Sequence, residues 1–250
     1  MKTRNTPPSD ASPFLPDVED NLKRTGFARV PHHIMRPALE GLGLQDWTSF
    51  AESWNHLGID RYMADAGRYR RRRYATFAVD QDNITPKPRQ PHYQSRDHNV
   101  LNGGIERWFK PIAPNVTAHP AMHAAIRAIA SLAYDLTPAE SRPNTWHAEV
   151  HQFRIEALPD AEGRPTPEGM HKDGVDWVLV LMIDRSNVEQ GTTTIHDDAQ
   201  TLLGSFTLTE PLDAAIVDDH RVFHGVTPVT PIDPTQPAHR DVLVITLRHE

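Results

Sequence analysis

Apolar residues recur at steps of three and four in two stretches of the chain. The first stretch runs from Trp47 to Leu57, and Asp46 stands where a helix cap is expected. The second stretch runs from Pro120 to Leu136 and ends before Pro138. This spacing predicts two amphipathic helices, each with its apolar side packed on a sheet.

From Trp146 onward the pattern changes to short β-branched runs separated by turn residues, which is typical of an all-β barrel or sandwich. An earlier run, Tyr69 to Val79, also has the alternation of a strand. The predicted fold class is therefore mainly β with helical support, in which N-terminal helices flank a β core. The predicted strands are 69–79, 146–155, 176–183, 192–196, 214–218, 222–226 and 241–247.

The length of 250 residues suits one domain of this kind. Residues 1–16 are polar and proline-rich and lack the apolar core of a secretory signal, so we expect a flexible tail there and a single domain over residues 17–250. No run approaches the ~20 apolar residues that a membrane-spanning helix needs. We expect a cytoplasmic protein without a membrane partner.

The formal net charge of -7 gives nucleic acids and anionic membranes no general electrostatic attraction to the chain. The chain has no cysteine, which excludes disulfides, thiolate catalysis and cysteine-ligated zinc and is compatible with a reducing cytosol. A metal ion would therefore need histidine, aspartate or glutamate ligands, and the chain has 15 histidines.

One pattern fits such a metal site. His171 and Asp173 stand two residues apart, so in an extended chain their side chains project to the same side. His224 offers a third ligand, and the intervening 50 residues have room for about four strands that return the chain to the same place. Two imidazoles and one carboxylate leave three coordination positions open, as in non-haem Fe(II) oxygenases, whereas a structural zinc site is closed.

A second His-x-Asp triplet begins at His196, which shows that the triplet alone is weak support for a metal site. Only 25 residues separate Asp198 from His224, and these leave few strands for the return. We expect His196 to be a surface residue at the end of a strand.

Arg240 opens the last apolar strand, after a proline-rich loop that would return the chain beside His224. A guanidinium grips a carboxylate by two parallel hydrogen bonds, as the distal carboxylate of 2-oxoglutarate requires. The alternative is an arginine paired with Asp241 or Asp218. Arg248 is a poor substitute, because it would lie roughly 26 Å farther along the strand.

Four segments carry a resemblance to a known family: residues 149–154, 167–176, 218–228 and 239–243. Together they resemble the bacterial 2-oxoglutarate/Fe(II) dioxygenases typified by L-isoleucine dioxygenase, strongly over the C-terminal half and more loosely over residues 69–77. The resemblance implies a double-stranded β-helix (jelly-roll) core, and Fe(II), 2-oxoglutarate and O2 as cofactor and co-substrates. One departure, Gln190-Gly191 where the family has a Gly-Gly pair, concerns the shape of a turn.

The resemblance further implies oxidation of a free L-amino acid with release of succinate and CO2. It assigns the iron ligands to His171, Asp173 and His224 and the 2-oxoglutarate clamp to Arg240. A carboxylate at Asp173 fills the position that a halide would need in a halogenating relative, so we expect hydroxylation or sulfoxidation of an aliphatic or sulfur-containing side chain.

The residues that recognise the substrate are less evident from the sequence. Gln152 and Arg154 share one face of the strand before the metal motif, and we predict that they line the pocket. In the run 70–73, alternation places two arginines on each face, and one of the four is a candidate for the substrate carboxylate. Asp218 or Asp219 is a candidate to support a ligand imidazole or Arg221.

Two alternatives stay open at this point. A metal-dependent hydrolase could use the same three ligands with a metal-bound water, and would give Arg240 no special role. A non-catalytic jelly-roll protein could bind a small ligand or a partner, and the metal motif would then be incidental. A nucleic-acid demethylase is disfavoured by the acidic balance. The sequence leaves the particular amino acid and the oligomeric state open.

Overall fold

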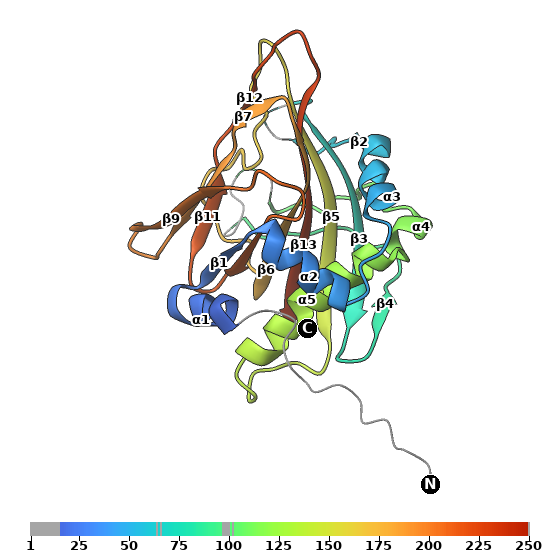
Figure 1. The fold of residues 1–250 in the computed structure, drawn as a ribbon, viewed down its shortest axis with the longest axis vertical. Helices are drawn as coiled ribbons and strands as arrows, with labels where there is room; N and C mark the ends of the chain where they lie inside the picture. The colour runs from blue at the N-terminus through green and yellow to red at the C-terminus, as the bar shows by residue number, and fades with distance from the viewer. Residues whose placement is uncertain (1–15, 64, 66, 97–100, 102, 250) are drawn as a thin grey trace.

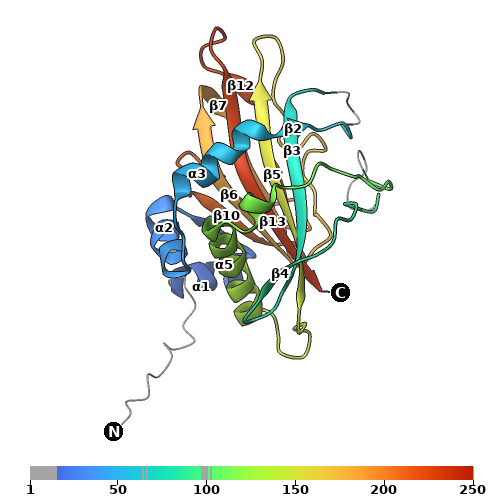
Figure 2. The ribbon, with the colours of Figure 1, turned by 90° about the vertical axis from the view of Figure 1, so that its right-hand side faces the viewer.

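The computed structural model describes residues 16–63, 65, 67–96, 101 and 103–249. A large twisted sheet forms the centre of the protein, and helices cover one of its faces (Figures 1 and 2). The predicted tail lies outside the described residues except for Pro16, which begins a helix. None of the described helices is long and apolar enough to cross a membrane.

Among the described residues, eight strands form the large sheet, in the order β1-β10-β6-β13-β5-β3-β2 with β4 paired to β3. These strands are β1 Phe27–Val30, β2 Gly58–Ile59, β3 Arg70–Val79, β4 Ile84–Pro86, β5 Trp146–Ala157, β6 Trp177–Ser186, β10 Ala214–Asp218 and β13 Ala238–His249. Two smaller sheets, β11-β8-β9 and β12-β7, complete the structure. Their strands are β7 Val188–Gln190, β8 Thr192–His196, β9 Leu202–Thr207, β11 Phe223–Val226 and β12 Val229–Pro231.

The pairings between these strands are antiparallel, and neighbours in space come from distant parts of the chain. This is the double-stranded β-helix that the sequence predicted. Each predicted strand is present within a few residues of its expected bounds. The strands that were not predicted are short or, in the case of β9, largely exposed, so they give little pattern in the sequence.

Both predicted helices are confirmed, the first as α3 Trp47–Glu52 continued by the 3-10 turn η1 Ser53–His56 and the second as α5 Pro120–Leu136. The helices that were not predicted are α1 Pro16–Thr25, α2 His32–Gly41 and the single turn α4 Pro114–Thr117. Helix α2 carries Pro37 in its interior, a residue that sequence analysis takes as a helix breaker.

Side chains alternate between the two faces of the large sheet, and this alternation separates the core from a cavity. Odd-numbered residues of β6 and β13, such as Leu181 and Ile245, pack in the main core with α5. Even-numbered residues of the same strands, such as Val180 and Val244, line a cavity on the other face. On β5 the order is reversed, and the odd-numbered residues from Glu149 to Ile155 face the cavity.

Trp54 fixes the segment α3–η1 to the centre of the large sheet. Its side chain is fully buried, and its indole Nε1 donates hydrogen bonds to the carbonyl oxygens of Phe153 (3.1 Å) and Val242 (3.3 Å). These two residues lie opposite each other on β5 and β13. The side chain therefore joins the helical layer to the two strands that carry much of the cavity wall.

Replacing Trp54 tests this joint. We expect Trp54→Phe to lower the free energy of unfolding by about 1–2 kcal/mol because the indole donor is lost, and Trp54→Ala by about 3–5 kcal/mol because a cavity is added. Trp47→Phe is the matched control, since Trp47 is only half-buried in the same helix, and it should change little. Urea unfolding measures all three variants, and a Trp54→Ala loss below 1 kcal/mol would contradict the proposed role.

Candidate active site

The structure brings together the three residues that the sequence suggested as metal ligands. The ligand atoms of His171, Asp173 and His224 all lie within 4.8 Å of one another. The two oxygens of Asp173 face different rings, with Oδ1 3.4 Å from Nε2 of His171 and Oδ2 3.4 Å from Nε2 of His224. The carboxylate and the two Nε2 atoms are therefore close enough together to bind one metal ion.

Backbone pairing holds the two histidines together. His171 and His224 form an antiparallel bridge in which each backbone N–H donates to the carbonyl of the other at 3.0 Å. His224 is part of β11, which pairs with β8, so the bridge attaches the loop that carries His171 to a sheet. The site is thus an extension of the β structure rather than a free loop.

Asp219 orders the turn that carries Asp173. Its Oδ1 accepts a hydrogen bond from the backbone N–H of Asp173 (3.0 Å), and its Oδ2 accepts from Gly174 (2.7 Å) and Val175 (3.1 Å). Gly174 has a φ of 78°, a conformation that favours glycine. Asp219 is 1% exposed and lies 3.8 Å from Nδ1 of His224. Of the two aspartates suggested by the sequence, this one supports the site.

The orientation of the ligands is set by further hydrogen bonds. Nδ1 of His171 donates to the carbonyl of Gly169 at 3.0 Å, which turns Nε2 toward Asp173. Gln94 donates from Nε2 to the backbone oxygen and to Oδ1 of Asp173 (3.0 and 3.2 Å). Burial disfavours the imidazolium form, but the hydrogen bond and charge of Asp173 outweigh it and raise the pKa of His171 to about 9. A metal ion that binds here replaces a proton.

The three side chains open into a cavity of about 490 Å³, within the usual range for small-molecule sites. One wall is apolar and is made by Val178, Val180, Val242 and Val244. The remaining lining is rich in charged side chains, and its arginines are Arg70, Arg72, Arg107, Arg240 and Arg248.

Arg240 is 2% exposed, and its Nε and Nη2 are buried without a hydrogen-bond partner among the described residues. Burial, together with the nearby Arg185, lowers the pKa of Arg240 to about 10, so the guanidinium is charged at neutral pH. Asp241, one alternative partner, instead forms a two-pronged ion pair with Arg154. A buried guanidinium without a partner is unfavourable until an anion binds it.

These observations fit the two groups that the sequence suggested. Two imidazoles and one carboxylate match the ligand set of a ferrous ion with open coordination positions. The unpartnered nitrogens of Arg240, in the same cavity, match the distal carboxylate of 2-oxoglutarate.

The structure places Gln152 and Arg154 away from the cavity. Gln152 donates to Oγ of Ser53 in the helical layer, and Arg154 pairs with Asp241 and with Asn55. Neither residue is among the described residues that line the cavity. They share a face, as expected, but it is the face of β5 that packs on the helices, so the contacts proposed below come from other residues.

Sequence reasoning missed several cavity residues on the opposite face of β5 and in the loop before α4. On β5 these are Glu149 and His151, which stand at odd positions next to the two that were chosen. The loop contributes His92 and Arg107, which pair with each other through the backbone. Alternation along β5 could have found the first two, whereas no periodic pattern marks the loop residues.

Residues 51–246 match the 2OG-Fe dioxygenase family. The chain belongs to this family. The match spans both smaller sheets and most of the large sheet, and it includes the three candidate ligands and Arg240.

Relatives of known activity are similar over nearly the whole chain. The L-isoleucine-4-hydroxylase of Bacillus thuringiensis is 26% identical, over 90% of this chain and 91% of its own length. The 3(1)-hydroxy-L-isoleucine 4-dioxygenase of Pantoea ananatis is 26% identical, over 91% of this chain and 94% of its own length.

Solved structures agree on the fold. A bsmA homolog from Methylobium petroleophilum is 34% identical with a TM-score of 0.83, over 93% of this chain and 92% of that protein. The structure of IDO from Bacillus thuringiensis has a TM-score of 0.74 at 19% identity, over 94% of this chain and 98% of that protein. The protein is a 2-oxoglutarate-dependent non-haem iron dioxygenase, which uses Fe(II), 2-oxoglutarate and O2. The hydrolase and the non-catalytic alternatives are not favoured.

The role of Asp219 can be tested at the metal. Asp219→Asn replaces one acceptor oxygen by an NH2 group that faces backbone N–H donors, so we expect the affinity for Co(II), used as an air-stable probe, to fall about 10- to 100-fold. Asp218→Asn is the neighbouring control, because Oδ1 of Asp218 accepts from the backbone of His220 and from no other described residue. Calorimetric titration compares the variants, and equal affinities for all three proteins would contradict the role.

Proposed function

We propose that this dioxygenase oxidises the side chain of a free L-amino acid, by hydroxylation or sulfoxidation, and releases succinate and CO2. The observation that carries the proposal is the buried guanidinium of Arg240, whose Nε and Nη2 have no partner among the described residues and which lies in the same cavity as the three candidate ligands. The similarity to two enzymes whose names specify isoleucine or a hydroxyisoleucine supports the choice of substrate class.

In this proposal His171, Asp173 and His224 would hold the iron, and a set of three protein ligands would leave coordination positions for the co-substrates. Bound ferrous iron, with 2-oxoglutarate and O2, supplies the oxidising power for the reaction. The chain holds the co-substrate in a fixed orientation, because Arg240 offers two nitrogens to its distal carboxylate. Asp219 and Gly169 keep the ligands in place through the hydrogen bonds described above.

The carboxylate of Asp173 also bears on the product. It is one of the three protein ligands in this assignment, so it would occupy the position that a halide needs in a halogenating relative. We therefore propose a hydroxylated or sulfoxidised product and not a chlorinated one.

The cavity wall favours a substrate with an apolar side chain. The four valines of β6 and β13 present methyl groups along one side of the cavity and offer no side-chain hydrogen-bond partner. An aliphatic or thioether side chain can be buried against them at about 25 cal/mol per Å², whereas a polar one would lose its hydrogen bonds to water. We therefore propose an aliphatic or sulfur-containing amino acid as the substrate.

The lack of cysteine is compatible with our further proposal of a cytoplasmic location.

Succinate release tests the function directly. The protein is loaded anaerobically with Fe(II) and 2-oxoglutarate, O2 is admitted, and succinate is measured against each of the twenty common amino acids. We expect strong stimulation by one or more aliphatic or sulfur-containing amino acids and no turnover in His224→Ala, because a ligand is lost. Succinate formation that no amino acid stimulates would remove the proposed function.

Arg240 has an expected effect on both co-substrate binding and stability. Arg240→Gln should raise the KM for 2-oxoglutarate about 100-fold, because a charged and hydrogen-bonded partner is lost. Without 2-oxoglutarate the variant should be at least as stable to urea as the wild type, because the substitution removes a buried charge that lacks a partner. Arg36→Gln, at an exposed position on α2, is the control and should change neither value. An unchanged KM in Arg240→Gln would refute the clamp.

A further inference from the structure

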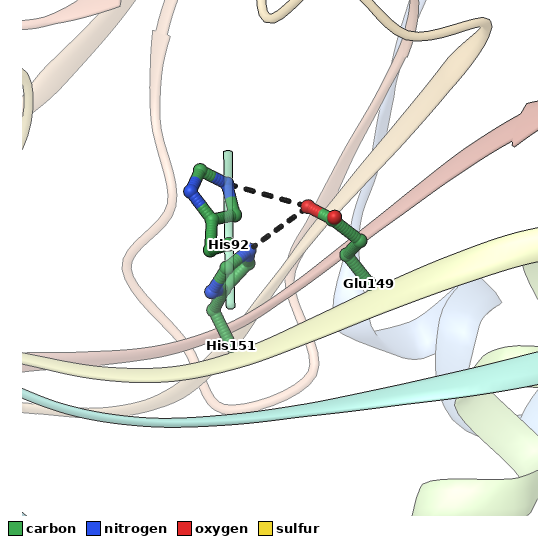
Figure 3. A group of neighbouring side chains, drawn as sticks. All are labelled: His92, Glu149 and His151. Atoms are coloured by element: carbon green, nitrogen blue, oxygen red, sulfur yellow. Dashed lines mark ion pairs between the residues drawn. The ribbon is translucent and has the colours of Figure 1, made fainter. Parts of the chain in front are cut away.

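A second group of two imidazoles and one carboxylate lies in the cavity lining. Glu149 and His151 come from β5, and His92 comes from the loop before α4 (Figure 3). Their ligand atoms lie within 4.8 Å of one another, and all three residues are buried. In residue types this group matches the candidate iron site, which raises the question of whether it binds a second metal ion.

The hydrogen bonds of the two imidazoles argue against a second metal ion. Nη2 of Arg72 lies 2.6 Å from Nδ1 of His151, and Nη2 of Arg107 lies 2.8 Å from Nδ1 of His92. A guanidinium only donates, so both Nδ1 atoms must accept. Burial lowers the pKa of His92 to about 4 and that of His151 well below its usual value, so both rings are neutral at pH 7.

A neutral ring that accepts at Nδ1 carries its proton on Nε2. In Figure 3 the two Nε2 atoms face Glu149, at 3.3 Å for His92 and 4.0 Å for His151. In each ring Nδ1 thus accepts a hydrogen bond from an arginine, and the proton on Nε2 faces the carboxylate of Glu149. No imidazole nitrogen of this group is left to bind a metal, and the group instead holds two guanidiniums in place.

These two guanidiniums have unused hydrogen-bond donors. Nε of Arg72 and Nε of Arg107 are both buried without a partner among the described residues. Arg72 lies between two rings, with its Cζ 3.5 Å from the ring centre of Phe109 and 4.5 Å from that of Phe153. The carboxylate of Asp60 is closest to Arg70, at 2.8 Å, and lies 3.5 Å from Arg72.

In the part of the chain that the structure describes, the hydrogen bonds of Arg107 go to neutral groups, and the carboxylates of Asp60, Glu168 and Glu149 act on its charge without forming an ion pair with it. Its Nη2 donates to His92 and, at 3.2 Å, to Oε1 of Gln94. A buried cation with neutral partners is a receptor for an anion. Gln94 in turn donates to Asp173, so Arg107 is one side chain away from a candidate iron ligand.

The arginines of this anion site come from other elements than Arg240. Arg240 on β13 and Arg70 on β3 both lie opposite Ile155 of β5, two strand spacings apart, and Arg72 lies two residues farther along β3. Strand geometry then puts the Cα atoms of Arg72 and Arg240 about 12 Å apart. The cavity therefore offers two carboxylate receptors, and 2-oxoglutarate needs only one guanidinium clamp.

We propose that Arg107, supported by Arg72, binds the α-carboxylate of the amino acid substrate, and that the group His92–Glu149–His151 positions these guanidiniums and binds no metal ion. This inference rests on the proposed function, because it takes a free amino acid as the substrate. It assigns substrate recognition to β3 and the loop before α4, in place of the outer face of β5.

Arg107→Gln tests the carboxylate receptor. The probes are the amino acid that releases the most succinate in the panel and the α-amide of that amino acid. We expect the KM for the amino acid to rise about 100-fold and the KM for the amide to stay within about threefold, so that the preference for the acid is lost. The KM for 2-oxoglutarate should stay within twofold. Anaerobic calorimetry with the Fe(II)- and 2-oxoglutarate-loaded enzyme measures the same loss of binding without turnover.

Two further variants serve as controls for this test. Arg89→Gln makes the same change at an exposed arginine that stacks on Trp108, outside the cavity lining, and should leave both KM values unchanged. Arg107→Lys retains a positive charge and should recover part of the preference for the acid. Urea unfolding of each variant separates a loss of recognition from a loss of the fold.

Metal content tests the second half of the proposal. We expect one bound Co(II) per chain in the wild type and in His92→Gln, and none in His171→Ala. A second Co(II) that disappears in His92→Gln would overturn the inference. An equal rise of the KM for the amino acid and the KM for its amide in Arg107→Gln would overturn it as well. The absence of amino-acid stimulation in the wild type would overturn the proposed function together with this inference, whereas stimulation in the wild type with an unchanged KM in Arg107→Gln would overturn the inference alone.

Discussion

The site depends on one backbone constraint, the pair of hydrogen bonds that His171 and His224 exchange. These residues are far apart in the chain, and the bridge fixes their Cα atoms at the distance of paired strands. The buried carboxylate of Asp219 then closes the turn after His171 through three backbone N–H groups, so that Asp173 faces both rings. Backbone pairing that the β-helix supplies thus brings the ligands together, and the hydrogen bonds of His171 to Gly169 and of Gln94 to Asp173 orient their side chains.

The second constraint is buried charge. Four charged residues of the cavity are buried, and an ion without a partner is costly there: Asp173, Glu149, Arg72 and Arg240. The two acids lie beside imidazoles, and Asp173 also accepts from the amide of Gln94. Among the described residues, by contrast, the guanidiniums of Arg72, Arg107 and Arg240 keep buried donors without a partner. In our proposal anionic ligands complete these sites, so the binding of the co-substrate and of a carboxylate-bearing substrate would stabilise the fold.

The patterns along the sequence predicted a mainly β fold with helical support, and the family resemblance implied the double-stranded β-helix. The sequence also suggested the three residues that the structure brings together, because the interval between Asp173 and His224 reflects the path of the chain around the β core. It identified the arginines of residues 70–73 as candidates for binding the substrate carboxylate, but it could not say which face of β3 lines the cavity. On β5, Gln152 and Arg154 were chosen only because residues two apart share one face of a strand. The alternation does not reveal that the helical layer covers this face. His92 and Arg107 lie in an irregular loop, where contacts are set by tertiary structure and leave no periodic pattern.

The central claim is that His171, Asp173 and His224 bind a ferrous ion with open coordination positions, beside Arg240. Ferrous iron chelated by a 2-keto acid absorbs visible light, so the most direct measurement is an anaerobic titration of 2-oxoglutarate into the Fe(II)-loaded protein. We predict a visible absorption band that saturates at one 2-oxoglutarate per chain, persists in His92→Gln and is lost in His171→Ala. The absence of a band in the wild type, or its persistence in His171→Ala, would contradict the account.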